Sequence, residues 1–416
     1  MRKIKAAVLG AGLIGKAHIE AIRRLGYVEV VAIGQSTQAT ADQYARELHV
    51  PKAYGNYIDL LNDEEIEVIH NCTPNHMHFE MNKQALLHGK HLLSEKPMTL
   101  TSEEAKELYL LAEEKQLATA VNFVYRQFPM VQHLKSMVTD HDLGDIRIVQ
   151  GHYLQDWLFY QTDYNWRMEP MYGGETRAIS DIGSHLYDLV QYVTGLRITE
   201  VLADSAIVIP QRFKPTNSSH SSSDALNASL NAQPSTPLSA FSNAPTSAQS
   251  TASSTTVLNQ GEALELIDIK NEDYCAVLVK FNNGARGVLT VSQVSAGKKN
   301  ALGISLDGSI ASGAWEQEEP CKLTLGYRDK PGETVMRDSN LVKKQAIPFV
   351  HYPSGHVEGW ADSLKNMMHQ FYGSISNQVG IPDSVASFKE GYQIMLINEA
   401  IVQSAKSGTW VSVIQV

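Results

Sequence analysis

The chain has 416 residues, of which 43% are hydrophobic, enough for two cores of ordinary domain size. Its net charge of −10 and its lack of a basic run argue against nucleic acid or an anionic membrane as a partner. No run could span a bilayer, the N-terminus does not resemble a signal peptide, and three scattered cysteines fit neither a disulfide framework nor a zinc site, so we expect a cytoplasmic protein.

The first third of the chain alternates short apolar runs with helical patterns. We expect strands over residues 5–9, 28–33, 66–71, 91–94 and 118–122, with helices over 14–25, 39–48, 77–88 and 102–115. Alternation with short links is typical of a parallel, doubly wound α/β sheet. We therefore predict a Rossmann-type dinucleotide-binding domain over residues 1–122.

The first strand runs directly into Gly10-x-Gly12-x-x-Gly15, with Leu13 and Ile14 inside the motif. The first glycine permits a tight turn, the second lets the backbone approach a pyrophosphate, and the third lets the helix pack close to the sheet. An ordinary strand-to-helix turn is the alternative. The strand before the motif and the helix after it favour dinucleotide binding.

Two further strand ends carry polar groups at the sheet edge where α/β proteins bind ligands. The segment Thr73-Pro74-Asn75-x-x-His78 opens a helix beside the expected cofactor. Glu95-Lys96-Pro97 follows the next buried strand, and the proline holds Lys96 extended. This lysine could donate to a hydroxyl or carbonyl oxygen, or it could be solvated; its position alone leaves both open.

From about residue 145 the pattern changes to longer strands with few helices between them. We expect strands over 146–154, 200–209, 274–281, 285–294, 302–306 and 322–327, and helices over 359–372 and 384–404. These elements predict a C-terminal α+β domain over residues 123–416, with a large, mostly antiparallel open sheet covered by helices on one face. Residues 215–260, rich in Ser, Ala, Thr, Asn and Pro, predict a disordered insertion within it.

Asp181 and His185 lie four residues apart, beside an apolar stripe over residues 179–193 that predicts a helix. A carboxylate one turn away could raise the pKa of the histidine and orient its ring for acid–base chemistry. An ordinary surface pair is the alternative. The ligands are too few for a metal, and we expect none.

An aromatic stretch with an arginine lies upstream of that helix. Aromatic faces and a guanidinium suit sugar rings and phosphate-bearing cofactors, whereas a packed contact between the two domains is the alternative. The residues are Trp157, Tyr160, Tyr164, Trp166 and Arg167.

As a set, these motifs resemble the Gfo/Idh/MocA oxidoreductases, over nearly the whole chain outside 215–260. The resemblance also includes Asn122-x-x-Tyr125-Arg126 and Asp181-x-Gly183-x-His185-x-x-Asp188. It implies an N-terminal Rossmann domain and a C-terminal open sheet that often mediates oligomers, so we expect a dimer or tetramer. Members mostly oxidise a secondary alcohol of a sugar or polyol, or catalyse the reverse reaction.

The resemblance also assigns roles. Lys96 resembles the active-site lysine, His185 the proton acceptor, and Asp181 its substrate-binding and orienting partner. Glu95, Asn122, Trp166 and Arg167 are assigned with Lys96 to the nicotinamide side. The substrate wall is expected to include Tyr125, Trp157, Tyr160, Tyr164 and His356.

The end of the second strand departs from the family pattern. Many members carry there an acid that binds the adenosine ribose, but this chain has Gln35 and Ser36. The missing carboxylate would tolerate a 2′-phosphate, yet no positive charge is present to hold one. NAD and NADP both stay open, with NAD favoured.

The sequence therefore predicts an NAD(P)-dependent dehydrogenase acting on a carbohydrate or polyol. Two other functions stay open: a glycoside hydrolase that retains its cofactor, and a non-catalytic NAD-binding sugar sensor.

Overall fold

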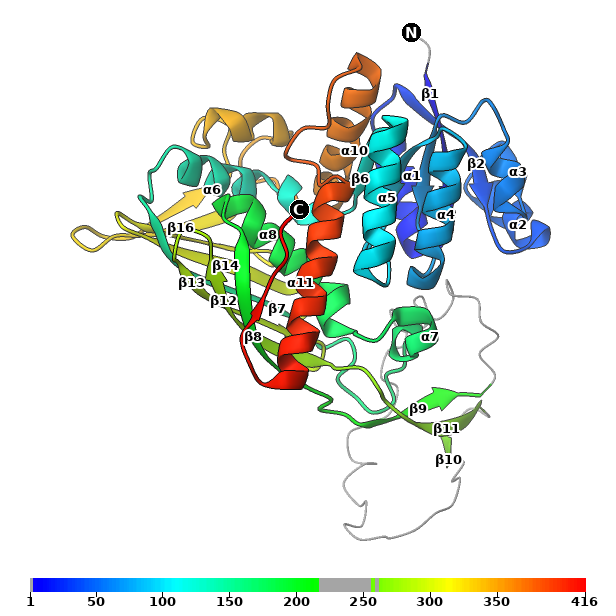
Figure 1. Cartoon of the computed structure of the whole chain (residues 1–416). Coiled ribbons are helices and arrows are strands. Elements are labelled where there is room, and N and C mark those ends of the chain that lie inside the picture. The colour runs from blue at the N-terminus through cyan, green and yellow to red at the C-terminus, as the bar shows by residue number, and fades with distance from the viewer. Residues whose placement is uncertain (1–2, 217–255, 259–261) are drawn as a thin grey trace.

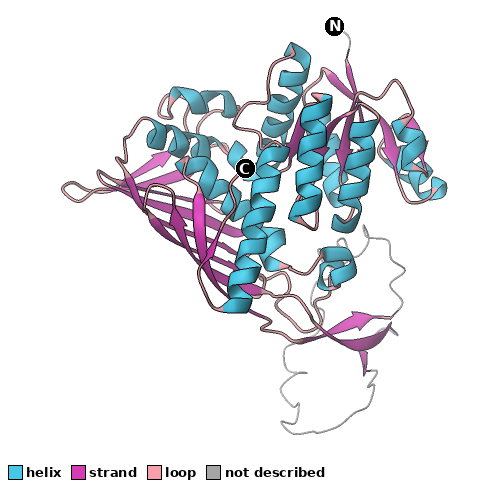
Figure 2. Ribbon diagram, viewed as in Figure 1, coloured by secondary structure: helices cyan, strands magenta, loops and turns pink. Residues whose placement is uncertain are grey.

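The computed structural model describes residues 3–216, 256–258 and 262–416 (Figure 1). Within them lie an N-terminal sheet flanked by helices, a larger sheet with helices over one face, and a small third sheet (Figure 2). One continuous hydrophobic core runs through the first two, and a small separate core lies beside the third.

The N-terminal sheet is six-stranded and parallel, in the order β3-β2-β1-β4-β5-β6. Its strands are β1 (Ile4–Leu9), β2 (Val28–Gly34), β3 (Lys52–Tyr54), β4 (Val68–Asn71), β5 (His91–Ser94) and β6 (Thr119–Val121). The helices are α1 (Leu13–Arg23), α2 (Gln38–Glu47), α3 (Tyr57–Leu61), α4 (Asn75–Leu87) and α5 (Ser102–Lys115). This confirms the predicted Rossmann sheet, to which the structure adds β3 and α3.

The strand order places a crevice at the carboxyl ends of β1 and β4. β1 pairs with β2 on one side and with β4 on the other. Successive strands are therefore added to one side of β1 as far as β3, and to its other side from β4 onward. Such a reversal point is where open α/β sheets bind ligands.

The second sheet is nine-stranded, in the order β17-β16-β15-β14-β7-β13-β12-β8-β18. Only the β7–β13 pair is parallel, which confirms the mostly antiparallel sheet. The strands are β7 (Ile146–Leu154), β8 (Ile198–Ala206), β12 (Tyr274–Phe281), β13 (Arg286–Ser292), β14 (Ala301–Gly308), β15 (Ser312–Glu316), β16 (Lys322–Gly326), β17 (Glu333–Met336) and β18 (Val411–Ser412).

Some of the remaining helices cover one face of this sheet, and others lie against the first domain (Figure 1). They are α6 (Pro129–Thr139), α7 (Pro170–Gly173), α8 (Ser184–Thr194), α10 (Trp360–Asn377) and α11 (Phe388–Ser407). α8 packs on β7, α11 packs on both β8 and α5, and α10 packs on α1. The other face leaves Ile148, Leu278 and Val288 exposed.

The third sheet has the order β10-β11-β9, from β9 (Gln211–Pro215), β10 (Thr256–Leu258) and β11 (Glu262–Asp268). The insertion expected over 215–260 lies mostly outside the described residues. Within it, the described residues 256–258 form β10, which pairs with β11.

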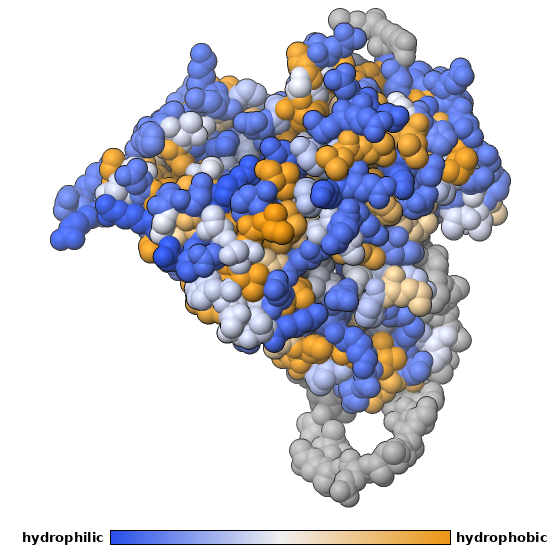
Figure 3. All heavy atoms as spheres, viewed as in Figure 1, coloured by the Kyte–Doolittle hydropathy of each residue, from blue (hydrophilic) through white to orange (hydrophobic). Residues whose placement is uncertain are grey.

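The surface view shows a largely hydrophilic face on which hydrophobic residues gather in small groups (Figure 3). Among the described helices, none combines the length and the apolar character needed to cross a membrane.

Candidate active site

The glycine loop after β1 is packed too closely for side chains. Gly10 has φ +81°, and a Cβ there would lie 2.7 Å from the carbonyl oxygen of Cys72. A Cβ on Gly15 would lie 2.2 Å from the carbonyl oxygen of Gly10. Gly12 caps α1 without a side chain, and the first turn of α1 has no acid. The loop therefore presents backbone amides where an anion can bind.

A pocket opens at this loop and extends to the second domain. Its lining comes from the glycine loop, the end of β2, the turns after β4 and β5, and the aromatic segment: Gly10, Gly12, Leu13, Ile14, Gln35, Cys72, Thr73, Pro74, Asn75, His78, Glu95, Lys96, Trp166 and Arg167. All but Cys72 were predicted cofactor residues. Gly15, Ser36 and Asn122 were predicted too but are not part of this lining.

The lining fits a dinucleotide. The side-chain nitrogen of Gln35 is buried without a hydrogen-bond partner among the described residues, at the strand end where a ribose is expected. His78 connects two walls of the pocket, because its ring contacts the carbonyl oxygens of Thr73 and Pro97, each at 2.7 Å.

Lys96, at the end of β5, reaches across to the second domain. Its Nζ donates to the Oδ1 and the backbone carbonyl of Asp181, both at 2.7 Å. Arg167 Nε lies 3.4 Å from the same Oδ1, and Gln293 donates to Oδ2 at 3.0 Å. Burial would raise the pKa of Asp181, but the charges of Arg167 and Lys96 outweigh it and hold this pKa well below its usual range.

His185 lies in the first turn of α8, directly after a π-helical turn over Ile179–Gly183. The ring is 7% exposed and packs edge-on against Tyr125 and Phe123, at centroid distances of 4.9 and 5.7 Å. Its Nδ1 is buried without a partner among the described residues. Burial, and then the charge of Lys96, lower the pKa of His185 to about 3, so the ring is neutral at physiological pH.

The structure corrects the expected Asp181–His185 pair. Asp181 does act to raise the histidine pKa, but the net shift is downward because burial and Lys96 dominate. Within the described residues, the hydrogen bonds of the Asp181 carboxylate go to Lys96 and Gln293 and not to His185. His185 is buried and Asp181 is half-buried, so the two are not a surface pair.

Three hydrogen-bonded polar side chains lie behind the His185 ring, and the sequence predicted only one of them. Tyr125 and Tyr153 share a hydrogen bond of 2.6 Å between their hydroxyls, and both bond the side chain of Asn300, at 3.1 and 2.7 Å. Tyr125 was predicted; Tyr153, Asn300 and Gln293 were not. Each missed residue is a single polar group in or next to a terminus of a strand, which carries no signal in one sequence.

The expected substrate aromatics lie on a loop beyond Asp181. Trp157 and Tyr160 are 55% and 54% exposed, and the backbone amide of Leu158 bonds the carbonyl of Gln293 at 3.2 Å. The hydroxyl of Tyr164 bonds Glu169. This loop reaches Asp181 through Gln293 and through Arg167, and the exposed Trp157 and Tyr160 lie nearer the surface than Lys96.

His356 does not belong with them. It is exposed, and its carbonyl accepts a hydrogen bond from Arg337 at 2.6 Å. The same loop brings Tyr352 to within 3.5 Å of Arg24, which follows the C-terminal end of α1. The pocket lies at the other end of that helix, about 16 Å away by helix length. The structure therefore does not place His356 with the other residues predicted for the substrate wall.

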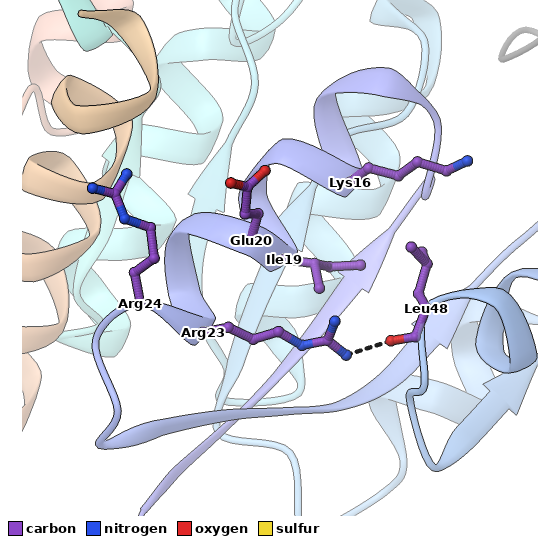
Figure 4. Close-up of a pocket in the computed structure, with 6 residues that line it drawn as sticks. All are labelled: Lys16, Ile19, Glu20, Arg23, Arg24 and Leu48. Atoms are coloured by element: carbon purple, nitrogen blue, oxygen red, sulfur yellow. Dashed lines mark hydrogen bonds between the residues drawn. The ribbon is translucent and has the colours of Figure 1, made fainter. Parts of the chain in front are cut away.

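A separate pocket lies on the outer side of α1, lined by Lys16, Ile19, Glu20, Arg23, Arg24 and Leu48 (Figure 4). Arg23 bonds the carbonyl of Leu48 there. None of these residues belongs to the set predicted for chemistry.

Comparisons with known proteins agree with this arrangement. A family model described as "Oxidoreductase family, NAD-binding Rossmann fold" matches residues 4–123, and one described as "GFO/IDH/MocA C-terminal domain" matches residues 131–312. The levoglucosan dehydrogenase of Pseudarthrobacter phenanthrenivorans is 26% identical over 431 residues and covers 100% of both chains. The glucose-6-phosphate 3-dehydrogenase of Bacillus subtilis is 29% identical over 189 residues, 45% of this chain and 53% of that protein.

Solved structures share the whole fold. Levoglucosan dehydrogenase in its apo form superposes with a TM-score of 0.85 at 23% identity, covering 100% of both chains. Its complex with NADH and L-sorbose superposes with a TM-score of 0.83 at 24% identity, again over both full chains.

The two family models cover both structural units in the expected order, and the architecture agrees along the whole length. The chain therefore belongs to the Gfo/Idh/MocA family of oxidoreductases with an NAD-binding Rossmann domain.

Proposed function

We propose that this protein is an NAD-dependent dehydrogenase that oxidises a secondary hydroxyl of a sugar, polyol or related carbohydrate. The observation that carries the proposal is the meeting of groups from two domains. Lys96 comes from the Rossmann sheet, and it bonds Asp181 of the second domain at 2.7 Å while its charge lowers the pKa of His185. One cationic donor and one neutral base thus converge beside a dinucleotide pocket.

The chemistry divides among these residues. NAD⁺ bound in the pocket supplies the hydride acceptor. His185, neutral above about pH 3, accepts the proton of the substrate hydroxyl. Lys96 has three N–H donors and gives two to Asp181, so a third is left to stabilise the developing oxyanion. Asp181 holds the ammonium in place and faces the substrate.

NAD is proposed over NADP on the basis of the end of β2. A 2′-phosphate needs a cation, and the pocket lining at this strand end is Gln35, an uncharged residue with a spare donor. That donor suits a ribose hydroxyl.

The carbohydrate class rests on the relatives and on the polar character of the site. Levoglucosan dehydrogenase and glucose-6-phosphate 3-dehydrogenase both take sugar substrates by name. Tyr125, with Trp157, Tyr160 and Tyr164 farther out, offers hydroxyls and aromatic faces to a sugar ring. A homo-oligomer is proposed through the open face of the nine-stranded sheet, where Leu278 and Val288 form an exposed cross-strand pair.

The test is a panel of polyols, aldoses, anhydrosugars and glycosides, followed for NADH and for NADPH formation at alkaline pH, with His185→Ala as the inactive control. Substrate-dependent NADH formation by the wild-type protein alone supports the proposal. Glycoside cleavage without accumulation of NADH would instead identify a hydrolase with a retained cofactor. NADH binding with no turnover of any compound would favour a sensor.

A further inference from the structure

A row of buried polar side chains leads away from the cofactor pocket into the second domain. Tyr372 of α10 shares a hydrogen bond of 2.6 Å with His70 Nε2. The two histidines His70 and His18 meet through their Nδ1 atoms at 3.0 Å. His18 Nε2 then lies 3.0 Å from Oε1 of Glu95, which lines the pocket. We call Tyr372, His70 and His18 the tyrosine–histidine chain; all three are 0% exposed.

The carboxylate at one end fixes the direction of every hydrogen bond in this row. An unprotonated His18 Nε2 would face the Glu95 carboxylate at 3.0 Å, two acceptors in contact, so this nitrogen carries a proton. A neutral His18 then has a bare Nδ1, which accepts from Nδ1–H of His70. The Nε2 of His70 is bare in turn and accepts from the hydroxyl of Tyr372.

The opposite direction leaves a donor without an acceptor. If Glu95 carried the proton and donated to His18 Nε2, His18 would donate to His70 and His70 to Tyr372, whose hydroxyl hydrogen has no other acceptor among the described residues. A buried donor of that kind costs about 1–3 kcal/mol. Burial also lowers the pKa of His70 well below its ordinary value, which keeps that ring neutral. Cys72 Sγ, 3.4 Å from His18 Nδ1, is a further donor toward the bare nitrogen.

Glu95 receives a second donor from the side chain of Asn122 on the same Oε1. Its Oε2 accepts the backbone amide of Lys96 at 3.3 Å. Burial would raise the pKa of Glu95, but the hydrogen bonds from His18 and Asn122 and the charge of Lys96 hold it below its usual range. The carboxylate is therefore ionised and held at the same end of the pocket as Lys96.

We propose that the tyrosine–histidine chain keeps Glu95 ionised and oriented at the nicotinamide end of the pocket, so that this residue favours the cationic nicotinamide ring of NAD⁺ over the neutral ring of NADH. The proposal rests on the proposed function in that it takes NAD as the ligand. Tyr372, His70 and His18 are positioning residues, which act through Glu95 on the oxidation state of the bound cofactor. The second domain thereby contributes to the redox preference of the first.

Other charged and titratable groups face this row. Those that interact with Glu95 are Lys96, His18, Cys72, His78 and His185, and those that face Tyr372 are Tyr27 and Glu67. The proposal therefore concerns the difference between variants rather than the absolute affinity.

The first test needs no cofactor. The protein is labelled with ¹⁵N-histidine and its NMR spectrum is recorded at pH 7, with resonances assigned from His70→Gln and His18→Gln variants. The tyrosine–histidine chain predicts a proton on Nδ1 of His70 and on Nε2 of His18. A proton on Nε2 of His70, or a doubly protonated His18, would overturn the proposal. This test is independent of what the pocket binds.

The second test compares the dissociation constants of NAD⁺ and NADH from pH 5 to pH 8 in wild type and Tyr372→Phe. The phenyl ring keeps its stacking on His70, at a centroid distance of 5.7 Å, and loses only the terminal donor. Nε2 of His70 then has no partner in either direction, so the direction in which a protonated Glu95 donates to His18 is no longer disfavoured. Glu95 can therefore take up a proton at mildly acidic pH. The preference for NAD⁺ should fall on the order of tenfold toward pH 5, the effect of removing one nearby charge.

Tyr192→Phe is the matched control, because it removes a buried hydroxyl that bonds Gln132 outside this row. It should leave the NAD⁺/NADH ratio unchanged at every pH. An unchanged ratio in Tyr372→Phe would sink the inference even if that variant were less stable. If neither NAD⁺ nor NADH binds the wild type, the proposed function fails instead, and the histidine resonances still decide the direction of the chain.

Discussion

Replacing Lys96 with methionine removes the ammonium while keeping most of the apolar stem. Two of its three donors bond Asp181, so one is available to a substrate oxygen. A charged hydrogen bond is worth about 1.5–3 kcal/mol, which is roughly 10- to 150-fold in rate at ~1.4 kcal/mol per decade. We therefore expect kcat to fall roughly 10- to 150-fold, with NADH still bound.

The fold should tolerate the change. Breaking a buried ion pair costs about 3–5 kcal/mol when the remaining charge has no other partner. Asp181 keeps Arg167 at 3.4 Å and Gln293 at 3.0 Å, so the loss of unfolding free energy should stay below that range. The pKa of His185 should rise, because the charge of Lys96 is its second largest lowering cause after burial. The acid limb of the pH–rate profile should therefore move toward neutrality.

The assay is steady-state NADH formation with the best substrate of the panel, beside a fluorescence titration with NADH. Lys83→Met is the matched control, because Lys83 pairs with Glu107 at 2.7 Å on the outer helices, far from the chemistry proposed here. A kcat within tenfold of wild type in Lys96→Met would refute the role given to this ammonium, and so would an equal loss in Lys83→Met.

Three further outcomes are expected. His185→Ala should lose at least ~10²-fold in kcat while its NADH dissociation constant stays within a few-fold, measured by the same two assays. Gly10→Ala should weaken NADH binding at least tenfold, because its Cβ would meet a carbonyl oxygen at 2.7 Å; Gly89→Ala shares the positive φ without a neighbour within 4 Å and should bind normally. Finally, His185, His70 and His78 have pKa values below 6.5 in the folded state, so the unfolded chain binds more protons in acid. The unfolding free energy measured by urea titration should therefore be highest above about pH 6.5 and should decrease toward pH 3, by up to ~1.4 kcal/mol per pH unit for each histidine. An unfolding free energy that does not change with pH over this range would contradict the burial of these histidines.

The Rossmann half was predictable because its signals are local. Each main strand is a short buried apolar run, and glycine or proline marks the turns at Gly10, Pro74 and Pro97. β3 and α3 escaped prediction because three and five residues carry no measurable period. α6 was also missed, although Pro129 in its first turn was an available signal.

The second domain was less predictable because its order depends on distant pairing. β7 pairs in parallel with β13, with Ile148 opposite Arg286, and no local pattern specifies a partner so far along the chain. The site was affected in the same way. The motifs identified Lys96 and His185, but spacing alone suggested that Asp181 stacks on His185. The π turn between them widens the local helix, and only tertiary structure directs Asp181 to Lys96.

The contact between Lys96 and Asp181 has a consequence for recombining parts of related enzymes. The ammonium and its carboxylate sit on segments that evolution could exchange separately, since each belongs to a different matched module. A hybrid that joins this nucleotide half to the other half of a distant relative inherits a working cofactor pocket but a misaligned lysine. Such hybrids should bind the dinucleotide but should not catalyse the reaction until further substitutions restore the contact between the two domains.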